Sequence, residues 1–142
     1  MQELKTNTAV RIPIGPFLDA ADALTPKLAL TVTDCSCEFF ARANNGGAVT
    51  RTSIALTASG GDNDMIHVSG DTVGMYDLEL TASQLNFLGE GVIVVIDSDV
   101  HLPVFETLRV ITEKEWDRRY GSGAAPGVGG ITAPVNIMTV EN

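Results

Sequence analysis

The residues of this chain that could bind a metal ion, form a disulfide or act as nucleophiles are two cysteines and two histidines. Cys35 and Cys37 are separated by one residue, and the histidines are His67 and His101. On a β-strand, residues two apart point to the same face at about 7 Å, which is too far for an easy disulfide. A zinc site needs four ligands, and neither histidine lies at a finger-like spacing from the cysteines. We therefore expect two small buried hydrophobic side chains.

Acidic residues form two short clusters, Asp62-Asn63-Asp64 and Asp97-Ser98-Asp99. Calcium takes six to eight oxygen ligands, and neither cluster continues into an EF-hand pattern. We interpret both clusters as turns whose Asp side chains cap strand ends. The alternative is a weak calcium site between loops that also holds sugar hydroxyls. We expect no metal and no cofactor.

Catalytic motifs are missing from the sequence. It contains no Gly-x-Ser-x-Gly elbow and no phosphate-binding loop. His101 follows Asp99 by two residues, and this spacing does not by itself make a catalytic triad. A pair of carboxylates would suffice for a glycosidase, but such enzymes need a deep groove, for which a chain of 142 residues offers little depth. We predict that the protein is not an enzyme and has no catalytic residues.

The charge is strongly acidic, at −9, and unevenly distributed. Between Arg51 and Arg109 the chain has no Lys or Arg, and every charged side chain in that interval is acidic. Such a surface repels phosphate backbones, so we expect no nucleic-acid partner. The acidic interval is either a solvated face or a surface for a positively charged partner.

Short β-strand signals recur through the chain and predict an all-β fold. Residues 35–42 alternate, with Cys35, Cys37 and Phe39 on one face and Phe40 on the other. Turn residues 44–47 should reverse the chain into a strand over residues 49–58, with Ala58 facing the core. Further strands are expected at residues 28–33, 65–68, 73–80, 91–96 and 104–111. The Val- and Ile-rich strand 91–96 should be buried on both faces.

Two capping-box spacings predict helical structure. Thr81 and Gln84 indicate one helical turn, while Thr112 and Glu115 open a short helix over residues 113–120 that Gly121 ends. Seven or so strands with regular turns predict an immunoglobulin-like antiparallel β-sandwich with this single short C-terminal helix. A small barrel is the competing architecture.

Composition divides the chain into three parts. Residues 1–11 are expected to be an extended N-terminal arm, of which part pairs as an edge strand. Residues 12–121 are the β-sandwich domain. Residues 122–130 have the Gly, Ala and Pro composition of a linker, and residues 131–140 are an apolar arm that cannot fold alone. No apolar run is long enough for a membrane span, and we expect no Sec-type signal because residues 1–11 lack a basic region followed by an apolar segment.

Several weak motifs occur in a consistent order across residues 12–123. They are Gly15-Pro16-Phe17-Leu18-Asp19, Thr25-Pro26-Lys27-Leu28-Ala29-Leu30-Thr31, Asn45-Gly46-Gly47, Gly74-Met75-Tyr76-Asp77-Leu78-Glu79-Leu80, Asn86-Phe87-Leu88-Gly89, Leu102-Pro103-Val104 and Glu115-Trp116-Asp117. In this order they resemble tailed-bacteriophage virion structural proteins with an N-terminal module similar to the baseplate upper protein family. The resemblance implies an immunoglobulin-like sandwich in a virion structural protein.

The resulting functional hypothesis is a non-enzymatic virion protein assembled in multiple copies through its terminal arms. A tail or neck connector, or a fibre-anchoring module, is the leading position in the virion. A capsid decoration protein is the first alternative, and a module that binds host carbohydrate is the second. We expect other virion proteins and copies of this chain as partners, no membrane partner, and location in virions assembled in the bacterial cytoplasm. The candidate partner-binding residues are Ile131, Val135, Ile137, Met138, Val140, Phe40 and Trp116.

Overall fold

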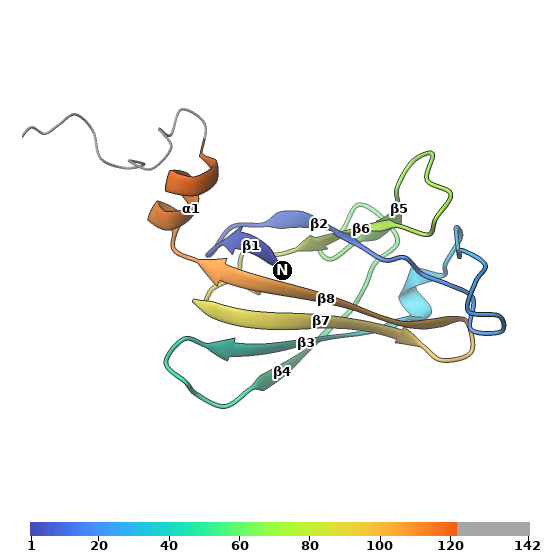
Figure 1. Cartoon of the computed structure of the whole chain (residues 1–142), viewed down its shortest axis with the longest axis horizontal. Coiled ribbons are helices and arrows are strands. Elements are labelled where there is room, and N and C mark those ends of the chain that lie inside the picture. The colour runs from blue at the N-terminus through green and yellow to red at the C-terminus, as the bar shows by residue number, and fades with distance from the viewer. Residues whose placement is uncertain (122–142) are drawn as a thin grey trace, which may run out of the picture.

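Two β-sheets face each other in the computed structural model of the protein, which describes residues 1–121 (Figure 1). The larger sheet has the strand order β1-β8-β7-β3-β4 and the smaller one the order β2-β6-β5. The strands of the larger sheet are β1 (Gln2–Lys5), β3 (Ser36–Ala43), β4 (Thr50–Ile54), β7 (Gly89–Asp97) and β8 (His101–Ile111). Those of the smaller sheet are β2 (Val10–Ile14), β5 (Met65–His67) and β6 (Tyr76–Leu80). The predicted mostly-β sandwich with one short C-terminal helix is confirmed at this level.

The core lies between the sheets because alternate residues of each long strand point inward. Phe39 of β3 is opposite Ile93 of β7, and both are almost fully buried. The smaller sheet contributes Ile12, Ile14 and Leu78, which are likewise buried. Cys35 and Cys37 are buried free thiols on this inner side, as the alternation predicted.

Strand β7 is central, but only one of its faces is buried. Ile93 and Val95 point into the core, whereas Val92 and Val94 are half-buried and Ile96 is 39% exposed. The prediction of burial on both faces is therefore wrong. A continuous apolar run is typical of a strand covered on both sides, and within residues 1–121 no element covers the outer side of this one.

Residues 1–11 are built into both sheets and do not extend as an arm, whereas the expectation that part of them pairs as an edge strand is confirmed. β1 pairs in parallel with β8, from Gln2 beside Leu108 to Lys5 beside Ile111. The chain then crosses to the smaller sheet, where β2 pairs antiparallel with β6. The β1–β8 pair also means that the sandwich is not purely antiparallel.

Residues 28–33 do not form the predicted strand. They run as irregular chain into a 3-10 turn, η1 (Val32–Asp34). The Tyr76 hydroxyl accepts the Leu30 backbone N–H at 3.0 Å and donates to the Lys27 carbonyl at 2.9 Å. A side chain thus satisfies backbone groups that a strand would have paired in a ladder.

The β3–β4 hairpin forms as predicted, although β4 is shorter than expected. It ends at Ile54, and Ala58, which we placed in the core, is exposed. Similarly, the strand expected from residue 73 begins at Tyr76. Residues 69–75 form a loop in which Asp71 accepts three backbone N–H groups, from Val73, Gly74 and Met75.

Helix α1 (Glu113–Tyr120) has the predicted bounds and cap. The Thr112 side chain accepts the Glu115 N–H at 3.1 Å. The helix buries no residue completely and packs beside β1 at one edge of the larger sheet (Figure 1). Residues 122–142, which contain the predicted linker and C-terminal arm, lie outside the described residues.

Candidate interaction surfaces

The outer face of the larger sheet carries an apolar patch, which we define as Phe40, Val92, Val94, Ile96 and Phe105. Strand register places Phe40 beside Val92, and Val94 beside Phe105. Phe105 is 64% exposed and Ile96 39%, while the other three are half-buried. Contiguous exposed apolar side chains on a sheet are typical of interaction sites. This outer patch contains Phe40, one of the residues predicted to bind a partner.

Charges of both signs border the outer patch. At one side, Glu90 accepts from Arg109 at 3.0 Å and Arg42 at 3.5 Å. These two guanidinium groups, Arg109 first, lower the pKa of Glu90. At another side, Arg51 Nη1 lies 2.8 Å from Glu38 Oε1. The sheet therefore offers an apolar centre with a mixed polar border, which is the usual composition of a protein interface.

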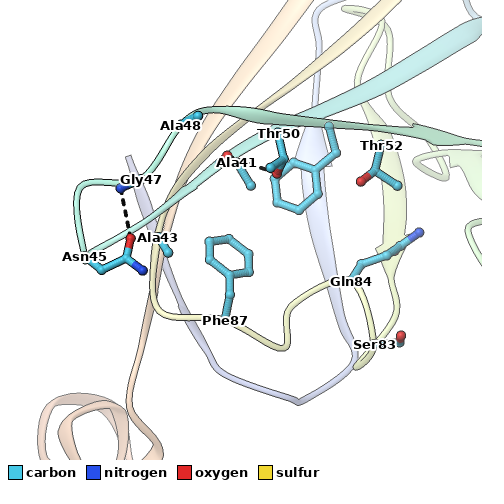
Figure 2. A pocket seen from close by; sticks show the side chains of 11 residues that line it. Ala41, Ala43, Asn45, Gly47, Ala48, Thr50, Thr52, Ser83, Gln84 and Phe87 are labelled. Atoms are coloured by element: carbon cyan, nitrogen blue, oxygen red, sulfur yellow. Dashed lines mark hydrogen bonds between the residues drawn. The ribbon is translucent and has the colours of Figure 1, made fainter.

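A groove of about 460 Å³ opens on the opposite face of the same sheet, at the free end of the β3–β4 hairpin (Figure 2). One wall is the inner face of the hairpin, with Ala41 and Ala43 from β3 and Thr50 and Thr52 from β4. Phe87 stands on the opposite wall (Figure 2). Beyond Phe39, the side chains from the sheet are small, so the groove is wide where the sandwich core would otherwise continue.

Hydrogen bonds fix the wall that faces the hairpin. Thr81 and Gln84 exchange the two bonds of a capping box, at 2.9 and 3.2 Å, as the sequence predicted. The Gln84 amide also exchanges two bonds with the buried side chain of Asn63. Thr6 donates to the carbonyl oxygens of Leu85 and Phe87, both at 3.1 Å. The groove is therefore preformed in the isolated chain.

Helix α1 is held against β1 mainly by charged groups. Lys5 Nζ lies 4.9 Å from the centre of the Trp116 ring and 3.1 Å from Asp117. Arg119 donates to both carboxylate oxygens of Glu3 at 2.6 Å. Trp116, another predicted partner-binding residue, is half-buried in this contact. Its ring thus forms part of the contact between the helix and the sheet.

A cysteine and a histidine meet in the core, which sequence reasoning missed. Cys35 Sγ is 3.7 Å from His101 Nε2, and His101 Nδ1 donates to the Leu102 carbonyl at 2.6 Å. Burial raises the pKa of the Cys35 thiol to about 11, with carboxylates at Asp97 and Asp34 adding to the effect. Because the thiolate is the nucleophile, this buried thiol is poorly suited to nucleophilic catalysis.

One carboxylate of the acidic clusters, that of Asp64, forms contacts within the protein. Asp64 accepts from Arg11 at 2.7 Å and from the Gly60 N–H at 3.2 Å. Within residues 1–121 no group of three or more His, Cys, Asp or Glu side chains is arranged to hold a metal ion. No helix in that part of the chain is both long and apolar enough to cross a membrane.

The remaining predicted partner-binding residues fall outside the described part of the chain. They are Ile131, Val135, Ile137, Met138 and Val140. Sequence reasoning also missed the groove, whose walls come from residues 39–52 and 83–87. A signal that could have revealed it is the pair of small residues Ala41 and Ala43, which follow Phe39 on the core-facing side of the same strand.

Comparison with protein-family models finds no match to this chain. Comparison with curated proteins finds no relative.

Proposed function

We propose that the chain is a non-enzymatic structural protein of a bacteriophage virion that assembles with further copies of itself. The observation that carries this proposal is the outer patch. Five apolar side chains on one face of the larger sheet are exposed or half-exposed to solvent in the isolated chain. Burial of exposed apolar surface is the dominant favourable term in most protein association. An assembled protein buries such a face in every copy.

The occupant that suits the outer patch is a second copy of this chain. Its border contains both acidic and basic groups, with Glu38 and Glu90 next to Arg42, Arg51 and Arg109. When two copies meet face to face about a two-fold axis, each border can place its carboxylates opposite the guanidinium groups of the other. The proposal that the assembled particle is a phage virion rests on the resemblance to phage virion proteins.

We further propose that the sandwich is immunoglobulin-like. The order β8-β7-β3-β4 corresponds to strands G, F, C and C′ of a variable-type domain. The order β2-β6-β5 corresponds to B, E and D of the facing sheet. Chain order and sheet order agree in both sheets, and this agreement supports the assignment.

Sedimentation of the purified full chain tests the proposed assembly. We expect a multi-copy species whose dissociation constant rises by about tenfold or more in the Phe105→Asp variant, because a buried aromatic anchor is replaced by a charge. The matched control is Val73→Asp, at a loop residue 55% exposed and outside the outer patch. A full chain that remains monomeric at high concentration, or a Phe105→Asp variant that assembles normally, contradicts the proposal.

Copy number in purified particles tests the position in the virion. A small multiple of three or six per particle is expected for a tail or neck connector. Hundreds of copies would instead identify a capsid decoration protein. Absence of the chain from particles would reject the virion assignment altogether.

A further inference from the structure

We infer that strand β4 and the groove beside it receive residues 131–140 of a neighbouring copy, added to the larger sheet as a further strand. The inference rests on the proposed multi-copy function and names the receiving site. It concerns the inner face and the edge of the sheet, whereas the outer patch is on the other face. The two contacts can therefore be tested separately.

The edge of β4 can accept a strand. β4 is the last strand of the larger sheet, and within residues 1–121 only β3 pairs with it. Its residues Thr50 to Ser53 are all exposed. A strand edge presents unpaired N–H and C=O groups, which an extended peptide satisfies by β-augmentation. The edge therefore supplies the main-chain part of a binding site.

The groove supplies pockets for side chains. Its floor has Ala41 and Ala43 of β3, which lie beside Gly91 and Gly89 of β7, and Phe87 closes the far side (Figure 2). A strand added beside β4 projects alternate side chains to the groove side of the sheet, next to Thr50 and Thr52. Large aliphatic side chains at that position can lean over the small residues of the floor and bring the packing density closer to that of a core.

Residues 131–140 have the matching alternation. Their odd positions begin Ile131, Ala133, Val135 and Ile137, while the even positions 132, 134 and 136 are Thr, Pro and Asn. One face of an extended segment is thus apolar over seven residues. In a strand, the N–H groups of odd positions all point to one edge. With odd positions toward β4, Pro134 lies on the other side, where its missing N–H removes no ladder bond.

The place where the described chain ends favours a neighbouring copy. Helix α1 and Gly121 lie at the β1 edge of the larger sheet, and β4 is the opposite edge (Figure 1). Residues 122–130 can span up to about 30 Å when extended. That length carries residue 131 from the β1 edge of one copy to the β4 edge of the next copy beside it.

Peptide binding to the full chain tests the site directly. The receptor is the full chain with Val135→Asp and Ile137→Asp, which disables its own segment and leaves residues 1–121 unchanged. The probe is a fluorescent peptide of residues 131–140. We expect saturable binding that weakens about tenfold or more when the Val135 nitrogen of the peptide is methylated, since a ladder bond is lost. Methylation at Asn136 is the matched control, expected to change binding by about twofold at most.

A second pair of variants tests the groove. Thr52→Lys puts a charged side chain into the groove, whereas Ser53→Lys puts the same side chain on the outer face beside Glu38. Both residues are exposed and belong to β4, so both variants should fold. We expect loss of peptide binding by about tenfold or more only in Thr52→Lys.

The outcomes separate this inference from the proposed function. Oligomers of the unmodified chain without peptide binding, or equal binding by Thr52→Lys and Ser53→Lys, overturn the inference and leave the proposed assembly standing. Peptide binding with an unmodified chain that stays monomeric places the segment in its own groove. That result overturns both the inference that a neighbouring copy supplies the segment and the proposed assembly.

Discussion

The two edges of the larger sheet differ, because one is covered by a helix and the other is exposed. At the β1 edge, Leu4 is buried and helix α1 covers the strand through Glu3–Arg119 and Lys5–Asp117 ion pairs. At the β4 edge, four of the five residues are exposed, and a groove opens beside them. Natural proteins usually shield sheet edges against pairing with other chains. A protein that covers one edge and leaves the other open has a surface suited to a specific partner strand.

Removing the buried side chain at the closed edge should have the largest effect. Leu4→Ala deletes the one fully buried side chain of β1, and we expect a loss of about 2–5 kcal/mol in the free energy of unfolding. The emission of Trp116, the single tryptophan, should change as well, because α1 packs on β1. Urea unfolding followed by fluorescence measures both.

The matched variant at the open edge is Ile54→Ala, which truncates a buried side chain of β4. It should cost a similar free energy and leave the native Trp116 emission unchanged. If both variants change that emission, the two edges are coupled and the contrast between them fails.

A smaller effect is expected at Gly91, which lies against the Phe39 ring that lines the groove. A Cβ atom added at Gly91 would lie 2.4 Å from Cε1 of Phe39, so Gly91→Ala must displace that ring. Phe39 packs against Phe87, with ring centres 5.9 Å apart. We expect a loss of about 1–3 kcal/mol from overpacking, measured by urea unfolding, together with weaker binding of the peptide of residues 131–140. Val92→Ala, the next residue but outward-facing, should leave peptide binding intact.

Acid should act on the closed edge and give the smallest change. Hydrogen bonds from Arg118 and then Arg119 lower the pKa of Glu115 from 4.5 to about 2. The Tyr120 hydroxyl and Arg119 also lower the pKa of Glu3. A lowered pKa means that the stabilisation is present above the ordinary value and is lost as pH falls toward the folded value. Trp116 emission should therefore change between about pH 4.5 and pH 2.

The control for this titration is Glu3→Gln. It removes the carboxylate that holds Arg119 and Tyr120, so part of the acid-dependent change should already be present at neutral pH. If Trp116 emission is flat down to pH 2 in the unmodified chain, α1 is held by something other than these ion pairs.

The sequence predicted best where a local pattern determines the structure. Helix α1 matched because Thr112, Glu115 and Gly121 fix its ends within one short segment. The burial pattern of β3 matched because a period of two leaves one choice of inner face. The Thr81–Gln84 capping box is local in the same sense.

Several failures involve contacts between distant segments. β1 has a single buried residue and is positioned by pairing with β8, which lies more than a hundred residues later in the chain. The Lys27 and Leu30 backbone groups find their partner in the Tyr76 hydroxyl, and Cys35 meets His101 66 residues away. The groove likewise exists only because one hairpin extends past the facing sheet. No periodicity in the sequence predicts these long-range contacts.

The opposite positions of α1 and β4 have a consequence for symmetry. If a segment leaves each copy at one edge and is received by a copy that lies beside it in the same orientation, each contact joins a β1 edge to a β4 edge. Such contacts are heterologous, so copies add in one direction and either close into a ring or continue as a filament. Face-to-face contact through Phe105 and its neighbours would then stack two rings back to back with dihedral symmetry.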